Sequence, residues 1–306
     1  MPREAFGPGY EFLHRSDLLS FEEITRLAGI FAGLGMQKIR LTGGEPLLRR
    51  DLEKLVEQLR GAVPAVELTL TTNGSLLGQK AASLKAAGLD RITVSLDALD
   101  EATFQKMNDA NFPAGKVVEG IEVALDAGFR PIKINTVVRR GVNEHAIGEL
   151  AERFAGPDYV LRFIEYMDVG NTNGWRMEEV VSAGEILAKL QFMGSRLTPL
   201  EPNYPGEVAR RYRTAAGGEI GIISSVTLPF CQHCHRARLG SDGRLYTCLF
   251  GTSGLDLRAP LRGGATDAEL TALIHGTWSA REDRYSEERT AAGASRVKVE
   301  MSAIGG

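Results

Sequence analysis

The feature that most constrains the fold is the alternation, between residues 20 and 195, of helical patterns with short runs of β-branched residues. Each repeat is roughly 25 to 35 residues long, the length of one strand and one helix in an α/β domain. Short strands connected in this way form a parallel sheet whose faces are covered by helices. Strands are predicted at residues 38–42, 66–72, 91–96, 131–138 and 159–165, and helices at residues 21–34, with Ser20 as the N-cap, and at 52–59, 80–87, 117–127, 144–154 and 182–190.

This alternation is compatible with an open doubly wound sheet and with a barrel. In both architectures, ligands bind beyond the carboxyl ends of the strands. The loops at those ends hold much of the polar and glycine content of the chain, and they lie at residues 43–46, 72–74, 97–100, 139–141 and 166–170. We therefore expect the functional site at this edge of the sheet.

The pattern changes after residue 195, so we divide the chain into residues 1–195, the α/β region, and residues 196–306. The second region has many turn signals and contains all three cysteines. Near its end, residues 279–289 are highly charged, and we interpret them as a solvated helix face.

Charge and composition narrow the class of protein. The 36 basic and 39 acidic residues give a net charge of −3, which argues against a general nucleic-acid or membrane-surface binder. No uncharged apolar run approaches the roughly 18 residues of a membrane span. Residues 1–9 contain no apolar segment typical of a signal peptide. We expect a cytoplasmic protein with neither nucleic-acid nor membrane partners.

The strongest local motif is Cys231, Cys234 and Cys248, with the spacing C-x2-C-x13-C. Three cysteines are too few for a disulfide framework, whereas closely spaced thiolates bind one soft metal centre. They could hold a [4Fe–4S] cluster with one iron open to another ligand. They could equally bind zinc, with His233 or His235 as the fourth ligand. The spacing alone leaves both metals open.

Other candidates lie in or just after the predicted strands. The glycines of Gly43-Gly44-Glu45 allow a ligand to approach the backbone, and Glu45 suits an ammonium group. Lys133 is a charge in a strand expected to be buried, so either an anionic ligand or a neighbouring carboxylate must face it. Arg236 and Arg238 follow Cys234; they suit phosphate oxygens, unless they form an exposed pair.

Several motifs together resemble the GTP 3′,8-cyclase family of radical S-adenosylmethionine enzymes, also called molybdenum cofactor biosynthesis protein A. The similarity extends over nearly the whole chain. The motifs that carry it are Tyr10–Leu13, Lys38–Arg50, Thr71–Gly74, Arg91–Asp97, Arg162–Gly170, Phe230–Leu239, Asp242-Gly243, Cys248–Phe250 and Gly305-Gly306.

The resemblance implies an incomplete (β/α)6 TIM-like barrel whose first strand is missing, with a C-terminal iron–sulfur region over residues 196–306. It implies that GTP is converted to (8S)-3′,8-cyclo-7,8-dihydroguanosine 5′-triphosphate, the first step of molybdenum cofactor biosynthesis, before cyclic pyranopterin monophosphate synthase acts. A homodimer and an unidentified electron donor are also implied. By motif, Cys231, Cys234 and Cys248 would hold a [4Fe–4S] cluster; Arg40, Thr71, Lys133, Arg236, Ala237 and Arg238 would contact GTP; and Gly44, Ser95 and Met167 would contact S-adenosylmethionine.

The chain departs from the family at the first cluster. In the family, three cysteines with the spacing C-x3-C-x2-C near the N-terminus hold that cluster. This chain has no cysteine before Cys231, and its Met1-Pro2 matches the dipeptide that follows that motif. Cleavage of S-adenosylmethionine needs an electron from such a cluster. We therefore expect a second, N-terminal [4Fe–4S] cluster only in a protein extended upstream of Met1, and we expect the chain as written to be inactive. The alternative is a nucleotide-binding or zinc-binding protein without radical activity.

Overall fold

The structure is a computed structural model that describes residues 13–109, 112–170, 173–204, 206–292 and 299–300. Its main feature is a sheet with the strand order β1-β2-β3-β4-β5-β8-β7-β6. The strands that run parallel are β1 (Lys38–Leu41), β2 (Glu67–Thr72), β3 (Arg91–Ser95), β4 (Ile132–Val138), β5 (Tyr159–Glu165) and β8 (Glu219–Ile223). Two antiparallel strands, β7 (Ala209–Thr214) and β6 (Leu197–Leu200), extend the sheet beyond β8.

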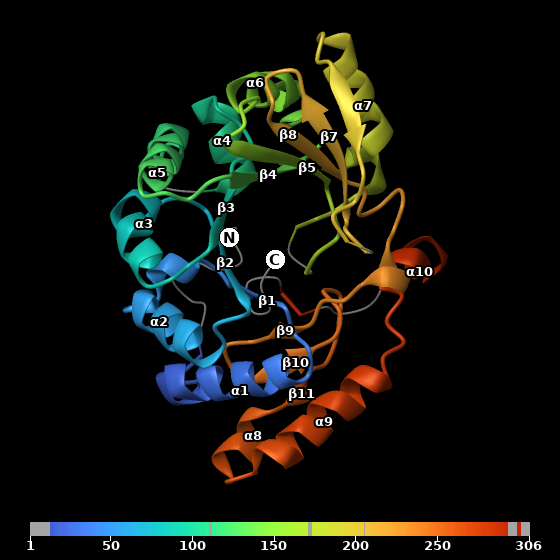
Figure 1. The fold of residues 1–306 in the computed structure, drawn as a ribbon. Helices are drawn as coiled ribbons and strands as arrows, with labels where there is room; N and C mark the ends of the chain where they lie inside the picture. The colour runs from blue at the N-terminus through green and yellow to red at the C-terminus, as the bar shows by residue number, and fades with distance from the viewer. Residues whose placement is uncertain (1–12, 110–111, 171–172, 205, 293–298, 301–306) are drawn as a thin grey trace.

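The sheet curves around a central space, and helices cover its outer face (Figure 1). These helices are α1 (Phe21–Gly33), α2 (Leu52–Ala62), α3 (Leu77–Ala86), α4 (Glu101–Asn108), α5 (Ala114–Asp126), α6 (Ile147–Arg153) and α7 (Ala183–Phe192). The predicted parallel α/β sheet is confirmed, and its curvature favours the barrel over an open sheet. Strands β6 to β8 continue this sheet beyond residue 195, where the sequence suggests a division of the chain.

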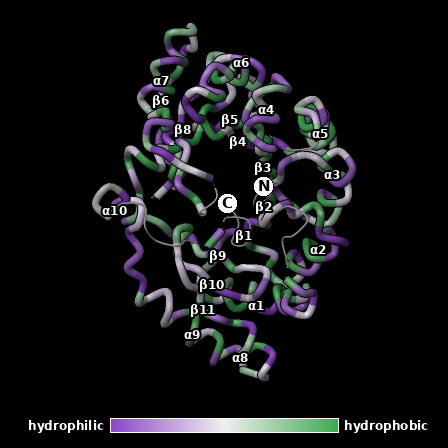
Figure 2. Tube along the Cα trace, turned by 180° about the vertical axis from the view of Figure 1, so that it is seen from behind, coloured by the Kyte–Doolittle hydropathy of each residue, from purple (hydrophilic) through white to green (hydrophobic). Residues whose placement is uncertain are grey.

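The hydrophobic core lies between the sheet and its helices. Leu70, Val94, Ile134 and Phe163 point outward from four neighbouring strands and are fully buried. Because successive side chains of a strand point to opposite faces, the residues between them face the central space. Those residues are largely polar, so hydrophilic and hydrophobic positions mix along these strands (Figure 2). The core of an ordinary TIM barrel is instead packed with branched apolar side chains.

A second, smaller layer closes one side of the molecule. It contains the antiparallel strands β9 (Arg238–Leu239), β10 (Arg244–Tyr246) and β11 (Leu255–Asp256), and the helices α8 (Arg258–Arg262) and α9 (Asp267–Ser279). The last described helix, α10 (Tyr285–Ala292), lies apart from α8 and α9 (Figure 1). Leu19, Leu27, Leu257, Leu261 and Leu270 form the hydrophobic core of this layer with α1. The beginning and the last third of the described chain are thus packed together.

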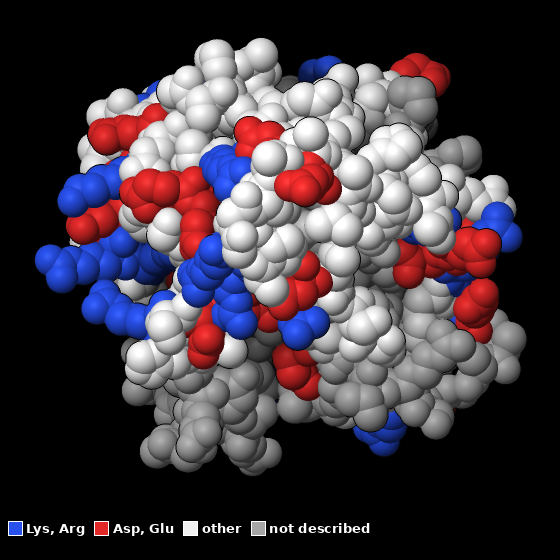
Figure 3. Space-filling model, turned by 90° about the horizontal axis from the view of Figure 1, so that it is seen from below, with Lys and Arg blue, Asp and Glu red and all other residues white. Residues whose placement is uncertain are grey.

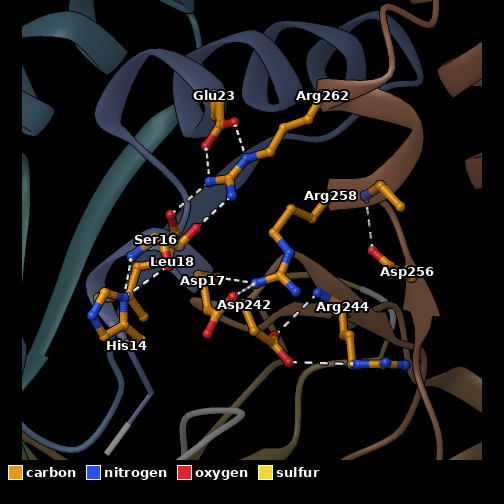
Figure 4. A network of polar contacts seen from close by, with 11 residues as sticks. His14, Ser16, Asp17, Leu18, Glu23, Asp242, Arg244, Asp256, Arg258 and Arg262 are labelled. Carbon is orange, nitrogen blue, oxygen red and sulfur yellow. Dashed lines mark hydrogen bonds and ion pairs between the residues drawn. The ribbon is translucent and has the colours of Figure 1, made fainter.

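Ion pairs reinforce this packing (Figure 4). Arg262 Nε lies 2.7 Å from Glu23 Oε1, and Arg258 Nη1 lies 3.3 Å from Asp17 Oδ1. Basic and acidic side chains are interspersed on the face seen in Figure 3, in keeping with the small net charge. No helix in the described part of the chain is both long and apolar enough to cross a membrane.

Candidate functional site

The inner face of the barrel carries two rows of polar residues on neighbouring strands. Strand pairing places Thr71 beside Thr93, and Thr93 beside Lys133. One row nearer the carboxyl ends of the strands, Ser95 pairs with Asn135 and Asn135 with Arg162. The sequence-predicted residues Thr71 and Lys133 therefore lie in the same row, on either side of Thr93.

The positive charge in this space exceeds the negative charge that neutralises it. Lys38 and Arg91 share Glu67, with N–O distances of 3.0 and 2.5 Å. Among the residues that the structure describes, Arg40, Lys133 and Arg162 form no ion pair. An anion bound here would meet cations that the protein itself leaves unneutralised.

The pKa of Lys133 reflects the electrostatic repulsion among these cations. Burial, and then the charges of Arg162, Arg91, Lys38 and Arg40, lower the pKa of the Lys133 ammonium group from 10.5 to about 7. Burial also lowers the pKa of Arg162. The space is therefore poised to bind an anion, which would relieve the repulsion.

Three buried polar atoms lining the space also lack a partner. Thr71 Oγ1, Asn135 Oδ1 and Arg162 Nε make no hydrogen bond within the described residues. Buried polar groups are hydrogen-bonded in most proteins, so each exception calls for an explanation. A ligand with both donors and acceptors would satisfy all three.

The loops at the carboxyl ends of the strands form the rim of this space. Gly43 has a φ of +138°, a conformation that favours glycine, and it allows the chain to turn between β1 and Glu45. Glu45 accepts hydrogen bonds from Thr72 Oγ1 (2.8 Å) and from the backbone N–H of Asn73 (2.7 Å) and Leu47 (3.0 Å). The carboxylate thus braces the loop against β2, a role that the sequence alone did not predict.

The three residues expected to contact S-adenosylmethionine lie on this rim. Gly44 follows β1, Ser95 ends β3, and Met167 follows β5. Since the strands are parallel, all three belong to the same edge of the sheet. Their grouping at one edge agrees with a shared site.

The cysteines lie in two segments of the chain, one between β8 and β9 and the other after β10. Cys231 begins the 3₁₀ turn η5 (Cys231–His233), Cys234 directly follows it, and Cys248 follows β10. All three are half-buried and free of disulfides. Among the described residues, no three His, Cys, Asp or Glu side chains are already arranged as a metal site. The thiols therefore supply the donors expected for a cluster without forming a closed ligand set.

Basic residues surround these thiols. Arg236 Nε donates to Cys234 Sγ at 3.4 Å, and the backbone N–H of Phe250 donates to Cys248 Sγ at 3.4 Å. Burial raises the pKa of Cys234, but Arg236 and hydrogen bonds from Arg281 and Arg236 outweigh this effect, so the pKa falls to about 7. Burial raises the pKa of Cys248. Cys234 is therefore the easier of these two to deprotonate for iron or zinc.

Arg236, Ala237 and Arg238 connect the thiols to the barrel. Arg238 is half-buried, and burial together with Arg236 lowers the pKa of its guanidinium to about 10, while the Cys248 and Cys234 thiols oppose the shift. The positive charge of Arg236 helps to lower the pKa of Arg40, and the positive charge of Arg40 helps to lower the pKa of Arg238. Arg40 of the barrel therefore lies within electrostatic range of Arg236 and Arg238.

Two charged residues of β5 were not assigned a role from the sequence. Arg162 is one of the unpaired cations, and Glu165 is fully buried at the end of the strand. The argument applied to Lys133, a charge inside a strand expected to be buried, would have identified Arg162. Glu165 is the last residue of its strand, and its partners come from distant segments. The Gly305-Gly306 tail, Tyr10 to Phe12 and the side chain of His233 lie outside what the structure describes.

Glu165 ties the barrel to the segment that leads to the cysteines. Its carboxylate accepts hydrogen bonds from the N–H groups of Ala183 (2.7 Å), Val226 (2.8 Å) and Thr227 (2.8 Å) and from Thr227 Oγ1 (2.5 Å).

We expect Glu165→Gln to lower the free energy of unfolding by about 3 kcal/mol, because an amide NH₂ would face buried N–H donors. Denaturation by urea measures this loss. The exposed Glu149 provides a matched control, since Glu149→Gln should change stability by less than about 0.5 kcal/mol. Equal effects of the two substitutions would contradict the assignment.

Comparison with known proteins shows which families this chain matches. A family model described as Molybdenum Cofactor Synthesis C matches residues 159–287, and one described as Radical SAM superfamily matches residues 5–154. A solved radical SAM methyltransferase from Sphaerobacter thermophilus aligns with a TM-score of 0.46 and 17% identity, over 56% of this chain and 53% of that one.

Two curated relatives are similar over far more of the chain. The GTP 3′,8-cyclase of Acidothermus cellulolyticus is 52% identical over 294 residues, which cover 94% of this chain and 81% of that protein. The GTP 3′,8-cyclase of Staphylococcus saprophyticus is 45% identical over 311 residues, covering 100% of this chain and 91% of that protein. The chain therefore belongs to the GTP 3′,8-cyclase family of radical S-adenosylmethionine proteins.

Proposed function

We propose that this protein binds GTP inside the barrel and serves its conversion to (8S)-3′,8-cyclo-7,8-dihydroguanosine 5′-triphosphate, the first step of molybdenum cofactor biosynthesis. The observation that carries the proposal is the group of unpaired cations, Arg40, Lys133 and Arg162, next to buried polar atoms that lack partners. A triphosphate supplies the negative charge and the acceptor oxygens that these groups need. The relatives named GTP 3′,8-cyclase support the identity of the nucleotide.

Each part of the site then has a task. Arg40, Lys133 and Arg162 neutralise the triphosphate, and the Thr71 hydroxyl donates to it. Arg236, Ala237 and Arg238 hold the nucleotide from the side of the cysteines. Gly44, Ser95 and Met167 bind S-adenosylmethionine at the rim. We propose that residues 1–195 and 196–306 contribute these two sides, although β6 to β8 belong to the barrel sheet.

The three cysteines fit a [4Fe–4S] cluster by the chemistry of their donors. Thiolates are the ligands that such clusters prefer, and N–H donors at two of these sulfurs are of the kind that tunes cluster potentials. A cluster held by Cys231, Cys234 and Cys248 would offer one open iron to a donor atom of the nucleotide. Arg238 would balance its negative charge from a half-buried position.

The same three cysteines limit what the chain of 306 residues can do, since they suffice for one cluster. After anaerobic reconstitution we expect about four iron and four sulfide ions per chain, and no 5′-deoxyadenosine when S-adenosylmethionine and a reductant are added. Metal and sulfide analysis, followed by chromatography of the reaction, checks both expectations. Zinc without sulfide would overturn the cluster and favour a zinc-binding protein, whereas 5′-deoxyadenosine would show that one cluster suffices for cleavage.

A further inference from the structure

A buried ion pair outside the proposed ligand contacts joins α10 to the loop after β5. Arg289 Nε lies 2.7 Å from Asp168 Oδ1, and both side chains are only 5% exposed. The Tyr285 hydroxyl donates to Asp168 Oδ2 at 2.6 Å, and Arg289 Nη1 donates to the backbone oxygen of Ser225 at 3.1 Å. The sequence-based interpretation of residues 279–289 as a solvated helix face is thus wrong for Arg289.

Aromatic rings complete the surroundings of this guanidinium. Its central carbon lies 5.2 Å from the ring centre of Phe250, 5.8 Å from that of Tyr285 and 6.0 Å from that of Trp175. The rings of Phe250 and Tyr285 are stacked, with centres 4.5 Å apart. One buried cation therefore contacts the loop after β5, the segment after β8, the segment after β10 and α10.

These segments are the ones that carry the proposed site. Asp168 directly follows Met167, Phe250 lies two residues after Cys248, and Ser225 lies on the segment leading to Cys231. The chain beyond α10 also returns here, because the Val299 N–H donates to the Gly251 oxygen at 3.4 Å. A side chain at Gly170 would collide with the Glu300 carboxylate, so that carboxylate touches the loop after β5. In Figure 1, α10 lies at the side of the central space, apart from α8 and α9.

Stability alone is a weak reason for such a pair. Removing two charges from water costs about as much as their attraction returns, and apolar residues of the same size often serve equally well. The hydrogen bonds that the two members make, from the Tyr285 hydroxyl to Asp168 and from Arg289 to the Ser225 oxygen, are directional and fix the relative position of these segments.

We propose that Asp168 and Arg289 are positioning residues that hold the Cys248 segment against the Met167 loop, so that the cluster side of the site meets the nucleotide. The inference rests on the proposed function. It separates two parts of GTP binding: the barrel cations attract the triphosphate, and the ion pair places the cysteine side relative to the rest of the nucleotide.

The test compares GTP with inorganic tripolyphosphate, which carries the charge of GTP without its nucleoside. The main variant is Asp168→Asn combined with Arg289→Met, which removes both charges of the pair together and keeps an acceptor for Tyr285. Arg289→Lys, which retains the charge, serves if the double variant does not fold. Arg284→Met is the matched control, because Arg284 precedes the same helix and its side chain is 58% exposed.

We expect the double variant to bind GTP about tenfold more weakly, with its iron and sulfide content and its affinity for tripolyphosphate unchanged. The change that GTP produces in the electron paramagnetic resonance spectrum of the reduced cluster should also diminish, and Arg289→Lys should show the same pattern. Unchanged GTP affinity and spectra, or an equal loss for both anions, would overturn the positioning role. If the unmodified chain bound neither GTP nor a cluster, the proposed function would fail before any variant was compared.

Discussion

Replacing Lys133 with methionine should weaken GTP binding by roughly 10- to 100-fold, the effect of removing one charged hydrogen bond to a phosphate. Methionine has a similar length but no charge, so the strand should keep its place beside Thr93 and Val160. Isothermal titration calorimetry measures the change. Lys80→Met is a suitable control, because Lys80 lies on α3 and pairs with Glu53 at 3.3 Å, outside the barrel.

Because the pKa of Lys133 is lowered, GTP affinity should depend on pH in a direction that can be predicted. In the folded, ligand-free protein the pKa lies at about 7, well below its ordinary value of 10.5. A bound triphosphate favours the charged form, so at pH 8 binding should take up as much as one proton, and GTP affinity should fall as the pH rises above 7. The terminal phosphate, with a pKa of about 6, is already ionised there and contributes little.

Calorimetry at pH 8 in buffers of different ionisation enthalpy detects this proton. Lys133→Met should abolish the buffer dependence, and Lys133→Arg should abolish it while retaining the charge. A buffer dependence that persists in both variants would show that Lys133 does not contact GTP. A GTP affinity of Lys133→Met within twofold of the unmodified protein would show the same.

Lys133→Met, which should weaken GTP binding, should stabilise the ligand-free protein. Because the folded state disfavours the Lys133 ammonium group, its cost to stability is fully present below pH 7 and disappears as the pH rises toward 10.5. Ligand-free Lys133→Met should therefore be more stable than the unmodified protein below pH 7 and similar to it at pH 10.5. Binding and stability are thus opposed at this residue, as expected where a site is prepared for a ligand.

Local periodicity was sufficient to predict the parallel sheet and the polar rim. Runs such as residues 132–138 alternate buried and half-buried side chains, and charges at the half-buried positions point to a ligand. It could not show that β8 joins β5, since that pairing connects residues about sixty positions apart. Nor could it show that Arg289 is buried, because the carboxylate and two of the rings that compensate its charge come from two other segments.

Glu165 and Arg289 illustrate why such residues elude a sequence-based analysis. Their surroundings are assembled from segments that are distant in the chain, and a charged residue in isolation is usually solvated. The motif containing Glu165 was visible, but its hydrogen bonds to Ala183, Val226 and Thr227 follow only from the fold. Lys133 was identified because its own strand predicts burial without any distant partner.

The substitution Cys248→Ser should eliminate the cluster. A serine hydroxyl is a hard, weakly acidic donor that replaces one of three thiolates, and even changes in the outer shell of a metal site commonly cost roughly 10- to 100-fold in affinity. We therefore expect most of the iron and sulfide to be lost after reconstitution. Thr252→Ala, four residues further along the same segment and exposed, should leave both at the level of the unmodified protein.

The loss should be selective, because the cysteines and the barrel cations belong to different parts of the fold. Cys248→Ser should retain its affinity for tripolyphosphate, which needs only Arg40, Lys133 and Arg162, and should lose the part of GTP affinity that an open iron contributes. Lys133→Met should show the reverse, with a complete cluster and weakened tripolyphosphate binding. If Cys248→Ser kept its iron and sulfide, the three thiols would not be the ligands. If it lost affinity for GTP and for tripolyphosphate equally, the cysteines and the barrel cations would not act as separate parts of the site.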